Sequence, residues 1–206
     1  MVDFEYAKNH GFEDVCKLMR ILREKCPWDA EQTHASIRGN MLEEACEAME
    51  AIDNGDAEPL CEELGDVLLQ VVFHATLAEE SGAFDIGRVT DTLCKKLIAR
   101  HPHVFGDTAV SGVTDVLSNW EAIKRQKKGQ ATVAENMRGV AATLPPIMRA
   151  EKLIKIARRA GIAAPDAELL MQGAMDAVRD AENALREACE KYVSDCESQP
   201  QPQLPQ

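Results

Sequence analysis

Apolar residues recur along this chain with the spacing of amphipathic helices, and no segment alternates apolar and polar residues as a half-buried strand would. Val15, Met19 and Leu22, for example, share one side of a helix predicted for about residues 11–25, which Pro27 ends. The pattern therefore predicts an all-α protein.

The same periodicity predicts the later helices. They are expected at about 40–53, 58–81, 86–101, 115–128, 145–160 and 165–196. Asp29 and Gln32 have the spacing of a capping box, which predicts a further short helix through EQTHASIR. HPHVFG, at 101–106, is expected to be a loop.

These elements suggest three parts of the chain. Residues 1–130 are predicted to form the main helical domain, and residues 131–196 to form a C-terminal helical extension. Residues 197–206, rich in proline and glutamine, are expected to be a disordered tail.

The net charge and the cysteine content limit which partners and which cellular compartment are plausible for this chain. The net charge of −12 argues against nucleic acid or an anionic membrane as the main partner and favours cations or ligands that carry them. Seven cysteines without a C-x-x-C pair indicate neither a disulfide framework nor a zinc site. No run of eighteen apolar residues and no signal peptide is evident, so we expect a cytoplasmic protein.

The stretch LEEACEAMEAIDNGDAEPLCEELGD holds ten carboxylates, and no lysine or arginine occurs between Arg38 and Arg88. Glu44 and Glu47, three residues apart, share one face of a helix. Taken alone, this helix is ordinary, because a carboxylate-rich face is usually solvated surface. The next helix changes the interpretation.

From Leu64 onward, that next helix is apolar around almost its whole circumference, which predicts burial on most sides. Its polar residues fall on one narrow line: Glu63, Asp66, Gln70 and His74. Ionised carboxylates in such a place cost several kcal/mol each unless they are protonated, paired or bound to a metal. If the two helices pack together, Glu44, Glu47, Glu63 and Asp66 converge on one site.

The ligand chemistry then favours Mg²⁺, with Mn²⁺ as the other candidate, because all four groups offer oxygen. A di-iron centre would need two Glu-x-x-His pairs, and only Glu31 and His34 have that spacing. Magnesium sites of this kind commonly bind substrate phosphates, so phosphate chemistry is the leading hypothesis.

Four motifs together resemble the MazG nucleoside triphosphate pyrophosphohydrolases. They are CPWDAEQTH, the EExxE beginning at Glu43, the ExxD beginning at Glu63, and KLIARHPHVFG. The resemblance implies an all-α fold whose four-helix-bundle cores associate as dimers or higher oligomers. It also implies magnesium-dependent hydrolysis of nucleoside or deoxynucleoside triphosphates to the monophosphate and pyrophosphate, which clears or regulates the nucleotide pool.

The matching motifs also imply roles for individual residues. Glu44, Glu47, Glu63 and Asp66 would be the metal ligands and the catalytic carboxylates. Residues with a substrate-binding role would be Lys96, Arg100, Trp120, Lys124 and Trp28. Asn40 and Cys46 stand where family members often carry aromatic residues, and Asn119 stands where they often carry lysine.

Two other classes of function remain open on the sequence. One is a related all-α pyrophosphohydrolase with a narrower substrate, resembling dUTPases or phosphoribosyl-ATP pyrophosphohydrolases. The other is a non-enzymatic helical interaction module whose acidic residues only face solvent. A helix that is apolar almost all round also suggests that part of its surface meets another subunit, which predicts at least a homodimer.

Overall fold

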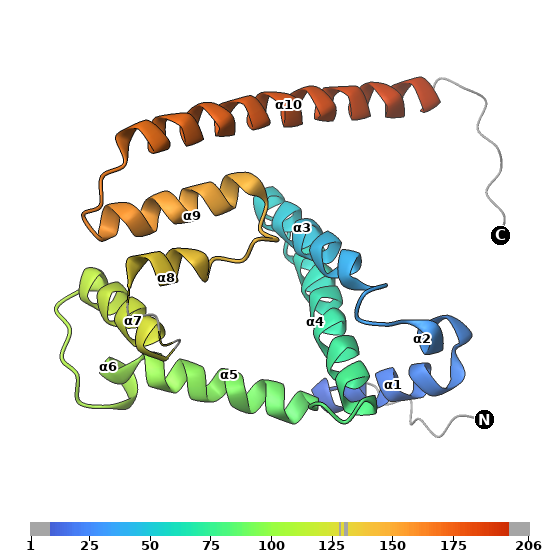
Figure 1. Ribbon diagram of the computed structural model, residues 1–206. Helices are drawn as coiled ribbons and strands as arrows, with labels where there is room; N and C mark the ends of the chain where they lie inside the picture. The colour runs from blue at the N-terminus through green and yellow to red at the C-terminus, as the bar shows by residue number, and fades with distance from the viewer. Residues whose placement is uncertain (1–8, 128, 130–131, 198–206) are drawn as a thin grey trace. The chain divides into compact units, whose positions relative to one another are not determined.

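The computed structural model describes residues 9–127, 129 and 132–197, and these residues form ten helices and no strand (Figure 1). The predicted all-α class is confirmed. Contacts divide the chain into two compact units, Met1–Thr108 and Ala109–Gln206. None of the helices in the described part of the chain has the length and apolar character that crossing a membrane requires.

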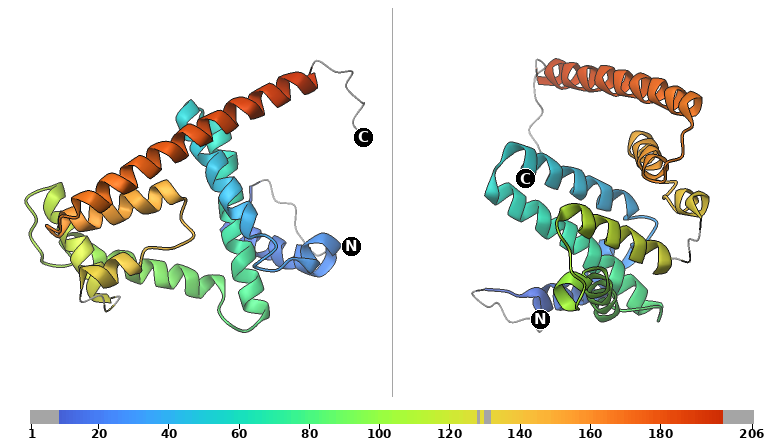
Figure 2. Two further views of the ribbon diagram at one scale, coloured as in Figure 1. Left: turned by 45° about the horizontal axis from the view of Figure 1, so that its top comes forward. Right: turned by 90° about the vertical axis from the view of Figure 1, so that its left-hand side faces the viewer.

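The N-terminal unit is built around a hairpin of two long helices. Its elements are α1 (Phe12–Lys25), α2 (Pro27–Glu31), α3 (Arg38–Asn54), α4 (Ala57–Glu80), α5 (Ile86–Arg100) and α6 (Pro102–Phe105). Helices α3 and α4 lie side by side in every view (Figure 2). Gly55 closes the hairpin with a φ of 77°, a left-handed conformation that glycine adopts without steric cost.

The core of this unit lies where α1 packs against the C-terminal half of α4. Met19 of α1 and Val72 of α4 are each only 1% exposed. The predicted burial of α4 holds for this half, but Leu64 and Leu68 in the other half are 54% and 37% exposed. Sequence periodicity alone therefore overestimates how much of α4 is covered within one chain.

Arg23 holds three segments of the N-terminal unit together. Its guanidinium forms hydrogen bonds of 2.6 and 2.8 Å with the carboxylate of Glu80, at the end of α4. It also donates to the backbone carbonyls of Asp29 and Gln32. One turn earlier on α1, Arg20 forms a more exposed ion pair with Glu79 at 3.1 Å.

Two local predictions are wrong. The predicted helix from Asp29 through EQTHASIR does not form, because α2 begins at Pro27 and ends at Glu31, and turns follow. Proline is well suited to the first turn of a helix, where its missing N–H is no loss. The same rule explains why Pro102 starts the short helix α6 within HPHVFG, which was expected to be a loop.

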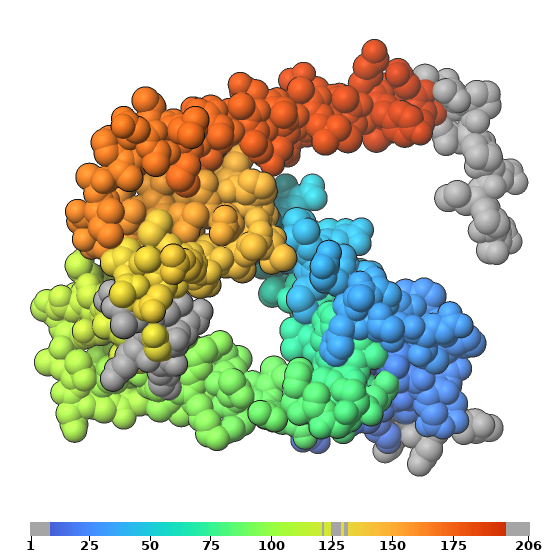
Figure 3. Space-filling view, viewed as in Figure 1, coloured from blue at the N-terminus to red at the C-terminus, as the bar shows by residue number. Residues whose placement is uncertain are grey.

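The C-terminal unit contains α7 (Val113–Lys127), α8 (Val133–Arg138), α9 (Pro146–Arg159) and α10 (Pro165–Glu197). Helix α8 was not predicted, although its capping box of Thr132 and Glu135 is visible in the sequence. Helix α10 packs against α9 and then extends beyond it with exposed side chains (Figure 3).

The two compact units meet after Thr108, so that α7 belongs to the C-terminal unit. The domain boundary at residue 130 stays a prediction. Residues 198–206 of the predicted tail, and residue 128 at the predicted end of α7, lie outside the described residues. Residue 197 is the last residue of α10.

Candidate active site

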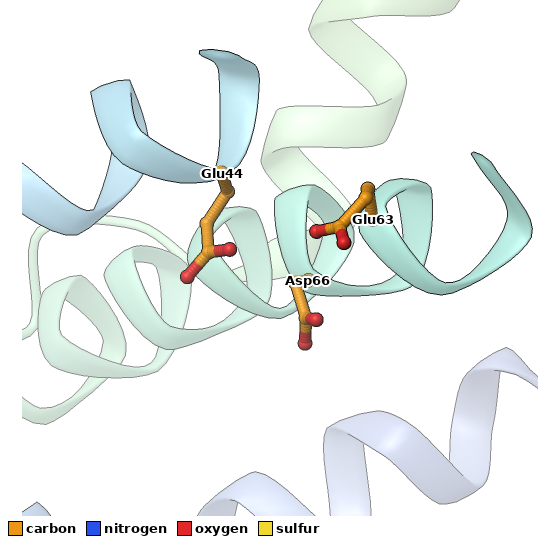
Figure 4. A group of neighbouring side chains, drawn as sticks. All are labelled: Glu44, Glu63 and Asp66. Carbon is orange, nitrogen blue, oxygen red and sulfur yellow. The ribbon is translucent and has the colours of Figure 1, made fainter. Parts of the chain in front are cut away.

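The α3–α4 hairpin brings together three carboxylates from its two helices. One oxygen each of Glu44, Glu63 and Asp66 lies within 4.8 Å of the others. Glu44 comes from α3 and the other two from α4, and their side chains meet between the helices (Figure 4). Each of the three is partly buried. We call Glu44, Glu63 and Asp66 the acidic group.

Helix geometry explains this arrangement. Glu63 and Asp66 are three residues apart on α4 and therefore share a face. Their face of α4 lies towards α3 in the hairpin, and Glu44 approaches it from the first two turns of α3. The predicted convergence of an acidic line on each helix is thus seen for three of its four members.

The charges of the acidic group are not neutralised by cations of the described residues. No lysine or arginine among residues 9–127, 129 and 132–197 forms an ion pair with any of the three carboxylates. Partial burial raises the pKa of Glu44, and the negative charge of Asp66 raises it further. Partial burial also raises the pKa of Glu63, followed by the charges of Glu47 and Asp66.

Glu47, the fourth predicted ligand, is exposed and lies outside the acidic group. It is still close enough for its charge to raise the pKa of both Glu44 and Glu63. Its carboxylate therefore borders the acidic group on α3 and is available to solvent.

Gln70 lies beside the acidic group. Its place on the polar line of α4 was predicted, but no role was predicted for it. It is 6% exposed, and its Nε2 donates to Oε1 of Glu44 at 3.4 Å. Its own Oε1 is buried and accepts no hydrogen bond from the described residues. The signal that could have identified Gln70 is its position as a polar residue one turn after Asp66, on a helix predicted to be buried.

The polar line of α4 ends at a pair of histidines. Nδ1 of His74 lies 2.8 Å from Nδ1 of His34, and the two rings are stacked with centroids 5.1 Å apart. Burial, followed by the neighbouring His34, lowers the pKa of His74. This is a packing and hydrogen-bonding role for His74, which holds the turn before α3 against α4.

The predicted substrate residues of the N-terminal unit lie apart from the acidic group. Lys96 is exposed and Arg100 is partly buried, both near the C-terminal end of α5. Helix α5 starts beside the C-terminal end of α4 and leads away from it (Figure 1). Trp28, on α2, is 59% exposed. One chain therefore does not place Lys96 and Arg100 beside the carboxylates.

The other two predicted substrate residues are on α7, in the C-terminal unit. Nζ of Lys124 lies 4.9 Å from the ring centroid of Trp120, which is a cation–π contact. Trp120 and Lys124 are four residues apart, and this spacing produces the contact directly because it spans about one helical turn.

The acidic group fits a hard divalent cation. It offers only oxygen ligands from two rigid helices. Burial, followed by neighbouring negative charges, raises the pKa of Glu44 and of Glu63. The buried, unsatisfied Oε1 of Gln70 adds a further oxygen beside it. Nitrogen or sulfur ligands that would favour zinc or iron are not part of this group of described residues.

Comparison with known proteins decides the family. The model of the MazG nucleotide pyrophosphohydrolase domain matches residues 32–105, which include the whole acidic group. The nucleoside triphosphate pyrophosphohydrolase/pyrophosphatase MazG of Thermotoga maritima is 40% identical over 179 residues, covering 86% of this chain and 67% of that protein. The chain belongs to the MazG family.

Other relatives of this MazG chain are longer. The nucleoside triphosphate pyrophosphohydrolase of Escherichia coli K12 is 41% identical over 67% of this chain and 54% of its own length. The uncharacterized protein YabN of Bacillus subtilis is 44% identical over 71% of this chain and 30% of its own length. The MazG chain thus spans about a third to a half of these two relatives.

Among solved structures, a mazG-related protein from Thermotoga maritima matches 55% of this chain and 98% of that chain. The TM-score is 0.49 and the sequence identity is 22%.

Proposed function

We propose that this MazG chain is a Mg²⁺-dependent nucleoside triphosphate pyrophosphohydrolase. It converts nucleoside or deoxynucleoside triphosphates to the monophosphate and pyrophosphate, and so clears or regulates the nucleotide pool. The observation that carries the proposal is the acidic group, in which three carboxylates from two helices lie within 4.8 Å without a cationic partner among the described residues. The names of the relatives in Thermotoga maritima and Escherichia coli support the same reaction.

Glu44, Glu63 and Asp66 would hold the ion, with Glu47 as the fourth ligand from the next turn of α3. Magnesium is the proposed ion and manganese an acceptable substitute, because both prefer oxygen ligands. When bound, the ion would polarise phosphoryl oxygens, stabilise the leaving pyrophosphate and lower the pKa of a coordinated water.

One of the chain's own carboxylates would also accept the proton of the attacking water. Glu47 is exposed and lies outside the acidic group. We propose that, besides binding the ion through one carboxylate oxygen, it orients a water molecule and accepts its proton through the other. The water oxygen forms a bond to phosphorus while the bridge between the α and β phosphates breaks. Pyrophosphate and the nucleoside monophosphate are the products.

Lys96, Arg100, Trp120, Lys124 and Trp28 would bind the nucleotide. Arginine and lysine suit phosphate oxygens, and an indole offers a flat face to a base. Because α5 leads away from α4 within one chain, we propose that Lys96 and Arg100 serve the acidic group of a second copy.

A homodimer is supported by the apolar side chains that α5 leaves uncovered. Leu93, Leu97 and Ile98 are between 44% and 51% exposed. Burying such a stripe against a second copy would remove it from water. Light scattering at micromolar concentration should give at least twice the mass of one chain, and a monomeric mass would refute the dimer. None of the described cysteines forms a disulfide, which fits the reducing, cytoplasmic location that we propose.

The test is release of pyrophosphate from a panel of standard and damaged nucleoside triphosphates. We expect release with millimolar Mg²⁺ or Mn²⁺ and none in excess EDTA. The panel also separates a broad enzyme from one restricted to a single substrate. If no triphosphate yields pyrophosphate under any of these metal conditions, the proposed activity is wrong.

A further inference from the structure

Two polar side chains are buried in the described part of the chain, and both belong to α4. Gln70 is 6% exposed and Thr76 is 7% exposed. The hydroxyl of Thr76 donates to the carbonyl of Val72, one turn earlier on the same helix, at 3.0 Å. The side chain of Gln70 forms no such bond within α4. Because a buried polar group costs free energy unless it is hydrogen-bonded, helix packing alone does not explain a glutamine at this position.

The amide of Gln70 reaches from α4 to a carboxylate of α3. Its Nε2 donates to Oε1 of Glu44 at 3.4 Å. The opposite orientation of the amide would set its carbonyl oxygen against an ionised carboxylate, and two acceptors repel each other. Gln70 follows Asp66 by one turn, so its contact ties Glu44 to the helix that carries Glu63 and Asp66, whose side chains meet Glu44 between the helices (Figure 4).

The other end of the amide is buried, and no described residue donates to it. Oε1 of Gln70 therefore needs a hydrogen-bond donor that the packed helices do not provide. The acidic group does not supply one, because ionised carboxylates are acceptors only. A hydrated cation would satisfy both needs, since the ion takes carboxylate oxygens and its waters offer O–H donors. Magnesium in particular keeps several of its waters in protein sites.

A glutamine suits this position better than the residue types closest to it in shape. Glutamate would bring a further negative charge to a group that already holds three carboxylates. Leucine or methionine would offer Glu44 no donor and a bound water no acceptor. The neutral amide has one of each at its two ends. It is therefore able to hold Glu44 and to bind a water molecule at the same time.

We propose that Gln70 is a positioning residue of the metal site. Its Nε2 holds the carboxylate of Glu44 towards Glu63 and Asp66, and its Oε1 accepts a hydrogen bond from a water molecule on the ion. The inference rests on the proposed function only for the presence of a divalent cation. Residues that orient a metal ligand without touching the metal commonly change metal affinity by about 10- to 100-fold.

The first experiment measures metal binding without nucleotide. The full chain is stripped of metal with a chelator, dialysed and titrated with Mn²⁺, and the electron paramagnetic resonance signal of free Mn²⁺ gives the affinity. Gln70→Leu keeps a side chain of similar size and removes both the donor and the acceptor. We expect this variant to bind Mn²⁺ at least about tenfold more weakly than the unmodified chain.

The matched control is Thr76→Val, which removes the other buried polar group of α4, further along the helix from the acidic group. Its affinity for Mn²⁺ should equal that of the unmodified chain. In EDTA, Gln70→Leu should melt no lower than Thr76→Val, because an apolar side chain of similar shape replaces a buried polar group that is only half satisfied. A loss of affinity without a loss of metal-free stability separates positioning from a purely structural role.

The second experiment addresses the carbonyl end of the amide. With Mn²⁺ saturating the site, the oxygen nuclear relaxation of isotopically enriched water reports how fast water on the ion exchanges with bulk solvent. A water held by Oε1 of Gln70 must break that hydrogen bond to leave. Exchange should therefore be severalfold faster in Gln70→Leu than in the unmodified chain, whereas Thr76→Val should match the unmodified chain.

Three outcomes would overturn the inference. Equal affinity of Gln70→Leu and Thr76→Val for Mn²⁺ would show that Gln70 does not hold Glu44 for the ion. A lower metal-free melting temperature of Gln70→Leu than of Thr76→Val would assign Gln70 to the stability of the fold. Equal rates of water exchange in the two variants would show that Oε1 does not contact a bound water.

The proposed activity fails on a different observation. If the chain binds Mn²⁺ with the expected dependence on Gln70 but never releases pyrophosphate, the proposed reaction is wrong and the positioning role stands. If the chain releases pyrophosphate and Gln70→Leu binds Mn²⁺ as tightly as the unmodified chain, the positioning role is wrong and the reaction stands.

Discussion

The two ends of α4 carry the same kind of side chain in opposite electrostatic settings. Near the C-terminal end, Glu79 and Glu80 are paired with Arg20 and Arg23 of α1. The hydrogen bond and charge of Arg23 lower the pKa of Glu80. In the other half of the helix, burial and neighbouring acidic residues raise the pKa of Glu63.

This difference separates carboxylates that hold the fold together from carboxylates that have no cationic partner among the described residues. The pair of Arg23 and Glu80 joins α1 to α4 beside the hydrophobic core. The acidic group lies where α4 is less covered, and its mutual repulsion works against the fold rather than for it.

Asp66→Asn should abolish most of the turnover. Replacing one proposed charged ligand with an amide should weaken metal binding, and a loss of at least about 100-fold in pyrophosphate release is expected. Circular dichroism should show unchanged helical content. The matched control is Glu79→Gln at the other end of α4, which should keep its turnover. Comparable losses in the two variants would contradict the separation of roles.

Magnesium should stabilise the chain through the acidic group. A ligand that binds only the folded state adds about 2.7 kcal/mol at a concentration 100 times its Kd. Thermal unfolding in EDTA and in saturating Mg²⁺ measures the shift. Glu63→Gln should reduce the shift strongly, whereas Glu79→Gln should leave it intact. An equal shift in both variants would place the ion elsewhere.

Arg23→Ala should destabilise the N-terminal unit by about 1–3 kcal/mol. The side chain of Arg23 is only 12% exposed, and its loss removes the donor to Glu80 and to the backbone carbonyl of Gln32. The carbonyl of Asp29 also loses a donor and keeps the backbone N–H of Gln32. Urea denaturation measures the change. Arg20→Ala, at a pair that is about half exposed, should cost less than about 1 kcal/mol. If Arg20→Ala proved the more damaging, the assignment of Arg23 as the residue that joins α1 to α4 would be wrong.

The two ends of α4 should respond to pH with opposite signs. Glu80 has a lowered pKa in the folded state, so its stabilisation is present above the unfolded pKa, about 4.3, and is lost as pH falls. Glu63 has a raised pKa, so the folded state holds its proton longer than the unfolded state does. Metal-free stability should therefore fall as pH rises from about 4.3 through that raised pKa.

Urea denaturation in EDTA across this range tests both effects. Glu63→Gln should flatten the loss of stability on raising the pH, and Glu80→Gln should flatten the loss on lowering it. The same slope in Glu63→Gln and in the unmodified chain would show that the acidic group is not under repulsion.

Much of the fold was predictable because helix periodicity and stop signals are local. The bounds of α1, α3, α5 and α9 agree with the predictions to within about two residues, as expected for patterns of this strength. The errors fall on short helices, α2, α6 and α8, where one turn carries too few apolar positions to show a period. There, proline at the first turn or a capping box decided the structure.

The candidate site was partly predictable. The spacing of Glu63 and Asp66 placed both on one face of a helix, and the buried line of α4 indicated that this face meets another helix. What the spacing could not show is that Glu47 stays exposed beside the group, or that Gln70 contacts Glu44. The placement of Lys96 and Arg100 away from the carboxylates also depends on the direction of α5, which no local pattern encodes.

The sequence by itself determined the all-helical class, the faces of the long helices and the concentration of acidic residues, because each depends on residues within a few turns of one another. Only the tertiary structure decided which carboxylates are paired and which are not. Arg23 lies 57 residues from Glu80, and Glu44 lies in a different helix from Glu63. Whether such charges attract or repel depends on packing that brings distant segments within a few ångströms, and that distance is a property of the folded chain alone.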